Sequence, residues 1–364
     1  MNAVIVNCFD TYENRVELIY RFLKQKCKNV KVITSDFRHS EKVFRDTERE
    51  DFVFLNTKPY YKNMSVARMY SHWNFARKAA RELEKSAPRL IYVLAPPNSL
   101  VKETIKYKKR HAGVKVIVDL IDLWPETMPI RRFKDSFLFG LWADIRDKYL
   151  DTADYVITEC DLYQNVLKNY LDKDKTKTIY LARKNAEVNI QETADDNKVS
   201  LCYLGSINNI IDIEVIGRII KAIDKAVDLH IIGAGEQKEE LLRIAKESGA
   251  VVYDHGRVYD ACAKQEIFNM CDYGLNIMKP YVCVGLTMKS IDYFEAGLPI
   301  INNIKGDTWE FVEQYGIGVN YLDDQCLKLF NVEKQHVREF FEKNFTEEVF
   351  FAHMECVYDA MFRK

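Results

Sequence analysis

The sequence lacks the features that mark several large protein classes. It has no run of roughly 18 consecutive apolar residues, the length that spans a bilayer, so no membrane-spanning helix is expected. Its nine cysteines form no Cys-x-x-Cys pair and no cluster with histidine, which favours reduced, buried thiols over a metal site. No zinc-finger, helix-turn-helix or RNA-binding aromatic pattern occurs, so nucleic acid is not an expected partner.

The length and composition describe a globular protein of two domains. A chain of 364 residues exceeds the usual size of one domain, and 48% hydrophobic with 29% charged residues is typical of a soluble protein. The first residues lead directly into the strand-like Ala3–Val6 with no basic start or cleavage site, so no signal peptide is expected. The cytoplasm is therefore the predicted location.

The charge is divided unevenly between the two halves. Residues 1–182 hold 33 Lys and Arg against 24 Asp and Glu, a net charge of +9. Residues 183–364 hold 20 against 30, a net charge of −10. The basic half therefore suits an anionic partner or an anionic surface, such as a membrane with acidic head groups.

Strand-like and helical segments alternate along the whole chain. In the first half the expected strands are Ala3–Asn7, Val30–Thr34, Asp51–Leu55, Leu90–Leu94, Val114–Leu120 and Tyr155–Thr158. The alternation restarts after the polar stretch Ala186–Lys198, which is the best linker candidate, and continues to about Tyr315. Such alternation predicts two doubly wound parallel sheets, in residues 1–183 and 184–344.

The stretch Gly285–Pro299 carries the strongest functional signal. It is expected to form a loop and then a short helix, which Thr287 caps and Gly297 ends. Lys289 and Asp292 are three residues apart and are expected on one face of the first turns. Free N–H groups, a lysine and a carboxylate suit a nucleotide diphosphate, because the first two take phosphate oxygens and the third accepts bonds from ribose hydroxyls. An ordinary surface lysine and aspartate are the alternative.

This stretch resembles the donor-site helix of GT-B glycosyltransferases, and among them the family 4 retaining enzymes. The resemblance implies two Rossmann-like domains facing a cleft, with residues 345–364 packing back on the first domain. It implies a nucleotide-sugar donor, a UDP-sugar above all, and neither a cofactor nor a metal. The donor-binding residues that it implies are Gly205, Ser206, Arg257, Val258, Gly285, Thr287, Met288, Lys289 and Asp292.

Two glycine-containing turns depart from that family's pattern. The family places cations beside the turn at Gly205, whereas this chain has Ser206-Ile207-Asn208-Asn209, so a purely structural turn is an equal alternative. Gly233-Ala-Gly235 looks like half of a dinucleotide fingerprint, but the third glycine is missing. A tight turn is the favoured interpretation of that second motif.

In the first half, Asp119–Glu126 resembles the Asp-Leu-Trp-Pro element of bacterial surface-polysaccharide glycosyltransferases. Asp122 is the candidate catalytic and acceptor-binding carboxylate, and Trp124 offers a flat face for a sugar ring. In the alternative interpretation, Asp122 caps the following turn and Trp124 belongs to the core. His72 is expected to be a packing residue and not a base.

Residues 131–150 fit two roles equally well. Aromatic and aliphatic residues recur there every fourth position among flanking Arg and Lys, as in a helix that lies on an anionic membrane. The same pattern describes a helix packed on a core.

The sequence therefore predicts a retaining glycosyltransferase, cytoplasmic or peripheral on the inner face of the cell membrane. Its acceptor would be a saccharide or lipid-linked saccharide for capsule, exopolysaccharide or lipopolysaccharide. A GT-B nucleotide-sugar epimerase and a non-catalytic partner subunit are the alternatives.

Overall fold

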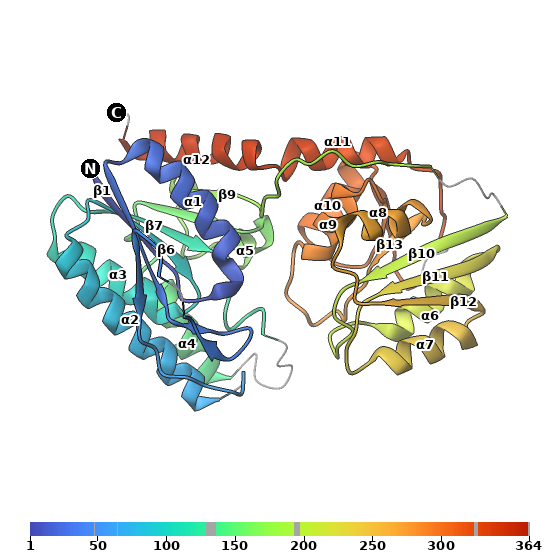
Figure 1. Cartoon of the computed structure of the whole chain (residues 1–364), viewed down its shortest axis with the longest axis horizontal. Coiled ribbons are helices and arrows are strands. Elements are labelled where there is room, and N and C mark those ends of the chain that lie inside the picture. Colours follow the sequence, from blue (N-terminus) through green and yellow to red (C-terminus); the bar gives the residue numbers. More distant parts are fainter. Residues whose placement is uncertain (47, 64, 129–135, 193–196, 324–326, 363–364) are drawn as a thin grey trace. The chain divides into compact units, whose positions relative to one another are not determined.

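The computed structural model describes residues 1–46, 48–63, 65–128, 136–192, 197–323 and 327–362, and it divides the chain into two compact units. Unit 1 comprises Met1–Ala182 and Glu347–Lys364, and unit 2 comprises Arg183–Thr346. Each unit is built on its own parallel sheet with helices on both sides (Figure 1). The predicted α/β class with two parallel-sheet domains is confirmed.

The sheet of unit 1 has seven parallel strands in the order β5-β2-β1-β6-β7-β8-β9. They are β1 (Asn2–Val6), β2 (Asn29–Ser35), β5 (Phe52–Leu55), β6 (Leu90–Ala95), β7 (Lys115–Leu120), β8 (Tyr155–Thr158) and β9 (Thr176–Thr178). Every residue of β6 is buried, as expected for a central strand that helices cover on both faces. The strand order changes direction between β1 and β6, which makes that point the switch point of the sheet.

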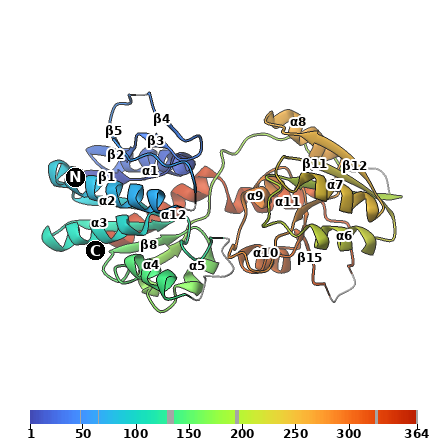
Figure 2. The same cartoon turned by 90° about the horizontal axis from the view of Figure 1, so that it is seen from below.

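The described residues of the first part of unit 1 also form five α-helices and a small hairpin. The helices are α1 (Glu13–Lys26), α2 (Val66–Ser86), α3 (Asn98–Arg110), α4 (Phe137–Asp147) and α5 (Asp161–Val166), and the hairpin strands are β3 (Phe37–Arg38) and β4 (Val43–Phe44). Helix α2 begins at Val66 because the Ser65 hydroxyl caps it, accepting a hydrogen bond from the Arg68 amide at 3.2 Å. Figure 2 shows α2, α3 and α4 as neighbours over the sheet.

The last helix, α12 (Glu347–Phe362), packs in unit 1 beside α1 (Figure 1). Phe350, Met354 and Val357 are buried in the same apolar cluster as Ile19 and Phe22 of α1. The return of the C-terminal helix to the first domain, which the resemblance implied, is therefore observed.

The sheet of unit 2 has six parallel strands in the order β12-β11-β10-β13-β14-β15. They are β10 (Lys198–Leu204), β11 (Ala226–Ile232), β12 (Ala250–Gly256), β13 (Tyr273–Asn276), β14 (Ile300–Asn302) and β15 (Gly318–Asn320). Its helices are α6 (Ile213–Ala222), α7 (Lys238–Glu247), α8 (Ala261–Asn269), α9 (Met288–Glu295), α10 (Asp307–Tyr315) and α11 (Lys334–Asn344). The strand order changes direction between β10 and β13.

The polar stretch 186–198 was expected to link the domains, but its described part belongs to unit 2. Its backbone is held there because Asn269 Nδ2 donates to the Asn189 carbonyl at 2.8 Å and Arg338 Nη2 donates to the Ala186 carbonyl at 2.7 Å. The division between the units falls after Ala182, one residue before the expected boundary.

Two further observations concern the described residues as a whole. None of the helices found there combines the length and the apolar character required to cross a membrane. Of the described cysteines, Cys8, Cys27, Cys160, Cys202 and Cys271 are buried.

Candidate functional site

In unit 2 the switch point of the sheet brings together the loops that follow β10 and β13. The Lys279 amide donates to the Ile210 carbonyl at 2.9 Å, which joins the two loops directly. Helix α9 begins at the end of the second loop, and its Tyr293 hydroxyl accepts a bond from the Leu204 amide at 2.7 Å. Ligands of open α/β sheets bind at such points, beyond the carboxyl ends of the strands.

The first turn of α9 is capped as the sequence predicted. The Thr287 hydroxyl accepts a hydrogen bond from the Ser290 amide at 3.1 Å, and the Ser290 hydroxyl accepts one from the Thr287 amide at 3.2 Å. This reciprocal pair is a capping box. It fixes the direction of the remaining N–H groups of the first turn, which gives the helix end a positive potential.

Three hydrogen-bonded asparagines, here called the asparagine ladder, connect the sheet to the capping residue Thr287. Asn276, Asn302 and Asn320 end three adjacent strands and are paired in register. Asn276 Nδ2 donates to Asn302 Oδ1 at 2.9 Å, and Asn302 Nδ2 donates to Asn320 Oδ1 at 2.8 Å. Asn276 Oδ1 then accepts the Thr287 hydroxyl at 2.8 Å, which connects the ladder to the helix start.

Lys289 is buried at the start of α9, with only 8% of its surface exposed. Its ammonium lies 4.7 Å from the centre of the Tyr203 ring and has no hydrogen-bond partner among the described residues. Burial lowers its pKa from the usual value to about 7. The Tyr203 hydroxyl donates to the Ser206 carbonyl at 3.0 Å, so Tyr203 connects Lys289 with the turn at Gly205.

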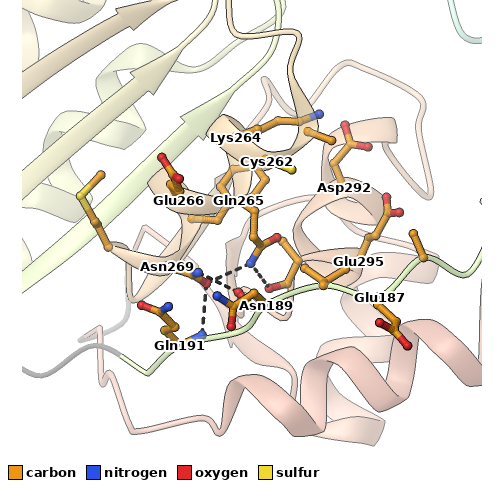
Figure 3. A pocket seen from close by; sticks show the side chains of 16 residues that line it. Glu187, Asn189, Gln191, Cys262, Lys264, Gln265, Glu266, Asn269, Asp292 and Glu295 are labelled. Atoms are coloured by element: carbon orange, nitrogen blue, oxygen red, sulfur yellow. Dashed lines mark hydrogen bonds between the residues drawn. The ribbon is translucent and has the colours of Figure 1, made fainter.

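Asp292 has different surroundings from Lys289, although one common face was expected. Asp292 Oδ1 lies 3.3 Å from Arg183 Nη2, and its carboxylate lines a pocket of about 570 Å³. Figure 3 shows Asp292 and Glu295 at one end of this pocket and hydrogen-bonded Asn269 and Gln191 at the other. Lys289 does not line the pocket, so the helix presents its cation and its carboxylate to separate surroundings.

The turns at Gly205 and Gly233 lie backbone against backbone. A Cβ on Gly233 would come within 2.0 Å of the Gly205 carbonyl oxygen, so only glycine fits there. Gly205 itself has φ of +115°, which other residues rarely adopt. Gly233-Ala-Gly235 thus serves the tight packing of two turns, in agreement with the favoured interpretation.

The remaining predicted donor residues are spread over three places. Ser206 and Met288 are exposed beside the Gly205 turn and at the start of α9. Gly285 is buried, and its carbonyl accepts bonds from the Thr308 amide and hydroxyl. Arg257 and Val258 follow β12, which is two strands away from β10 at the edge of the sheet.

In unit 1, Asp122 and Trp124 are engaged with their neighbours. Asp122 Oδ2 accepts the Trp124 indole N–H at 2.6 Å and Oδ1 accepts the Thr127 hydroxyl at 2.5 Å, and burial raises the pKa of Asp122. Trp124 is 8% exposed, with the Arg68 guanidinium 4.3 Å from its ring centre and the His72 ring stacked at 5.7 Å. The expected open face for a sugar is therefore covered, and the alternative of a turn cap beside a buried tryptophan describes this packing.

Tyr203 and the asparagine ladder belong to none of the motifs that indicate a function in the sequence. A signal was present, because Gly-Leu-Asn, Ile-Ile-Asn and Gly-Val-Asn recur in unit 2, where they end β13, β14 and β15. Their meaning depends on the pairing of those strands, which one chain read alone does not reveal. Among the described residues no group of three His, Cys, Asp or Glu side chains is arranged to hold a metal.

No protein-family model and no curated protein matches the chain, but solved structures do. The lipopolysaccharide outer core galactosyltransferase WaaB matches at a TM-score of 0.70 and 13% identity, over 100% of this chain and 99% of that one. HepE of Anabaena in complex with UDP matches at 0.69 and 12%, over 99% and 100%. A Listeria monocytogenes protein described as a UDP-N-acetylglucosamine 2-epimerase matches at 0.55 and 9%, over 100% and 96%. At these identities the likeness establishes the fold, and the chain has the GT-B fold.

Proposed function

We propose that the chain is a glycosyltransferase whose donor is a UDP-sugar. The observation that supports this most is the buried Lys289 at the start of α9, whose ammonium has no hydrogen-bond partner in the described part of the chain. A cation and helix N–H groups without a protein anion are suited to the diphosphate of a nucleotide. Two neighbours of the same fold, WaaB and HepE, are a galactosyltransferase and a protein seen with UDP.

In the proposed reaction the bond between the anomeric carbon and the UDP oxygen breaks, and an acceptor hydroxyl forms the new bond on the same face of the sugar. The hydroxyl proton passes to the departing phosphate, so that retention of configuration needs no protein nucleophile and no metal. Lys289 and the α9 N–H groups stabilise the negative charge that develops on the leaving diphosphate. Asp292, on the same helix as Lys289, is the proposed acceptor of hydrogen bonds from the ribose hydroxyls.

The first test is a thermal-shift and calorimetric panel of UDP, GDP, ADP, CMP and their sugars without added metal. We expect UDP to stabilise unit 2 selectively. Lys289→Met should raise the stability of the free protein by about 1–3 kcal/mol, because an unsatisfied buried amine is removed, and should abolish the UDP effect. Lys246→Met, an exposed lysine of α7, is the matched control and should leave both quantities unchanged.

A panel without any nucleotide response would contradict the proposal and favour the non-catalytic partner subunit. The epimerase alternative, which one structural neighbour represents, is distinguished by the product. An epimerase would release free sugar from the UDP-sugar when no acceptor is present, whereas a transferase would need an acceptor for efficient turnover.

We further propose that α4 contacts an anionic membrane, where the lipid-linked acceptor of a surface polysaccharide would reside. Phe137, Leu138 and Leu141 are 78%, 73% and 45% exposed, so this part of the helix is not packed on a core. Residues 131–135 of the proposed segment lie outside the described residues. We expect salt-sensitive binding to vesicles with acidic lipids and weaker binding of Phe137→Ser with Leu138→Ser. Absence of binding at low salt would contradict this part.

A further inference from the structure

Unit 1 contains a cluster of cations and aromatic rings near the carboxyl ends of its central strands. Its members are Lys42, Tyr60, Arg68, His72 and Trp124, here called the Arg68 cluster. The Arg68 guanidinium lies 4.3 Å from the ring centre of Trp124 and 5.6 Å from that of Tyr60. The Lys42 ammonium lies 4.3 Å from the same Tyr60 ring. Two cations therefore share one aromatic environment.

Neither cation has a carboxylate partner in the part of the chain that the structure describes. Arg68 Nη1 donates to the Asn63 carbonyl at 3.0 Å, while its Nε is buried without a hydrogen-bond partner. Lys42 Nζ donates to the neutral Asn63 side chain at 2.8 Å. Both charges are held close together, although like charges repel each other.

Two carboxylates that interact electrostatically with these cations, those of Asp10 and Asp122, bond to other groups. Asp10 accepts the backbone N–H groups of His39 and Ser40 and the Ser40 hydroxyl. Asp122 accepts bonds from Trp124 and Thr127. Burial, followed by the charge of Arg68, lowers the pKa of both Lys42 and His72, as expected where positive charge is not neutralised.

His72 supplies a separate observation that points to a ligand. It is 5% exposed, and its Nε2 has no hydrogen-bond partner among the described residues. It lies four residues after Arg68, so both side chains project from one face of α2 toward Trp124. A buried ring nitrogen without a partner costs free energy unless something absent from the free protein bonds to it.

The surrounding sequence has the same sign of charge. Residues 52–81 contain six Lys and Arg and no Asp or Glu. The loop before α2 and most of α2 therefore attract anions over a longer range than the cluster alone.

We infer that the Arg68 cluster binds a phosphate or diphosphate ester carried by the acceptor, an inference that rests on the proposed function. The guanidinium is suited to two phosphate oxygens at once, Lys42 adds a second charge, and His72 Nε2 forms a further hydrogen bond. A lipid-linked and a soluble phosphorylated acceptor present the same chemistry to these groups.

The experiment is a calorimetric titration of inorganic pyrophosphate into the full chain with UDP at saturation, so that the proposed phosphate site of unit 2 is filled. Pyrophosphate should still bind. Arg68→Gln should weaken this binding about tenfold or more, because charge-assisted hydrogen bonds are lost. Arg68→Lys should keep part of the affinity. The matched control is Arg77→Gln, since Arg77 lies on the same helix against Trp73 at 4.8 Å and outside the cluster.

Equal pyrophosphate affinity in Arg68→Gln and the wild-type chain would overturn the inference, as would binding that disappears whenever UDP is present. Failure of UDP to bind would count against the proposed function only. In that case the titration is repeated with Lys289→Met, which removes the cation of unit 2 and leaves the Arg68 cluster intact.

Two further probes distinguish the source of the phosphate. Binding to phosphatidic acid vesicles that depends on Arg68 supports a lipid-linked acceptor, and binding of glycerol 3-phosphate alone supports a soluble one. If neither probe binds in an Arg68-dependent way, the assignment to an acceptor phosphate is wrong.

Discussion

At the scale of single residues, a buried lysine without a counter-ion destabilises a folded protein unless a ligand supplies the anion. Lys289 has this position, and its pKa of about 7 means that much of it is neutral in the free protein at neutral pH. The folded pKa is below the unfolded one, so the unfolded chain binds more protons above pH 7. The contribution of Lys289 to the free energy of unfolding should therefore rise as the pH increases from about 7 toward 10.

Binding of UDP should accordingly be linked to uptake of a proton by Lys289. From about pH 7.5 to 8.5 the phosphates of UDP are already ionised and its uracil ring still keeps its proton, so the change in affinity reports the protein. We expect the affinity to fall by up to about tenfold per pH unit, because the neutral amine must be protonated before it pairs with phosphate. Calorimetry in two buffers of different ionisation heat measures the uptake. A flat profile, or a slope that persists in Lys289→Met, would assign the linkage to another group.

The burial of Lys289 could not be predicted from its own neighbourhood in the sequence. The motif predicted the helix and its cap correctly, because both depend on residues within one turn. Whether the lysine points to solvent or to Tyr203 depends on the packing of α9 against β10, which lies far away in the chain. The same limitation explains Trp124, whose ring is covered by Arg68 and His72 of α2.

At the scale of secondary structure elements, the asparagine ladder connects three strands with the start of α9. Asn302 is fully buried, and its side chain forms four hydrogen bonds, with Asn276, Asn320 and both backbone groups of Ile304. The ladder thus transmits the register of β13, β14 and β15 to the position of Thr287.

Asn302→Ala should destabilise unit 2 by about 2–4 kcal/mol, since it leaves several buried polar groups without partners. It should also weaken UDP binding, because the cap of α9 loses its support. Chemical denaturation and UDP titration measure the two effects. Asn29→Ala removes an exposed Asn–Asn hydrogen bond in unit 1 and is the control, with little change expected in either quantity. A destabilised Asn302→Ala variant with full UDP affinity would show that the ladder does not position the site.

The sequence predicted the central strands of both sheets and missed several of the shortest elements. The central strands of both sheets were recognised because burial on both faces makes them continuously apolar. The three-residue strands β9 and β15 and the hairpin β3–β4 were missed, since so few residues carry no periodic pattern.

At the scale of the whole molecule, two units with separate cores should unfold in two transitions. UDP should raise the midpoint temperature of the unit 2 transition and leave that of unit 1 unchanged. Met354→Ala, in the core that α12 shares with the rest of unit 1, should lower the free energy of unfolding of unit 1 by about 2–5 kcal/mol. Glu348→Ala, at an exposed position of the same helix, is the control. Calorimetry that shows a single transition, shifted alike by UDP and by Met354→Ala, would mean that the units unfold together.

The buried cysteines give each unit an internal reporter of its own opening. Burial raises the pKa of the thiols of Cys8 in unit 1 and Cys202 in unit 2, so both are unreactive toward alkylating reagents while their surroundings stay closed. The rate at which each thiol is labelled under native conditions therefore follows the transient opening of one unit independently of the other. The opening of each unit can thus be measured separately in the same chain, without introduced residues or denaturant.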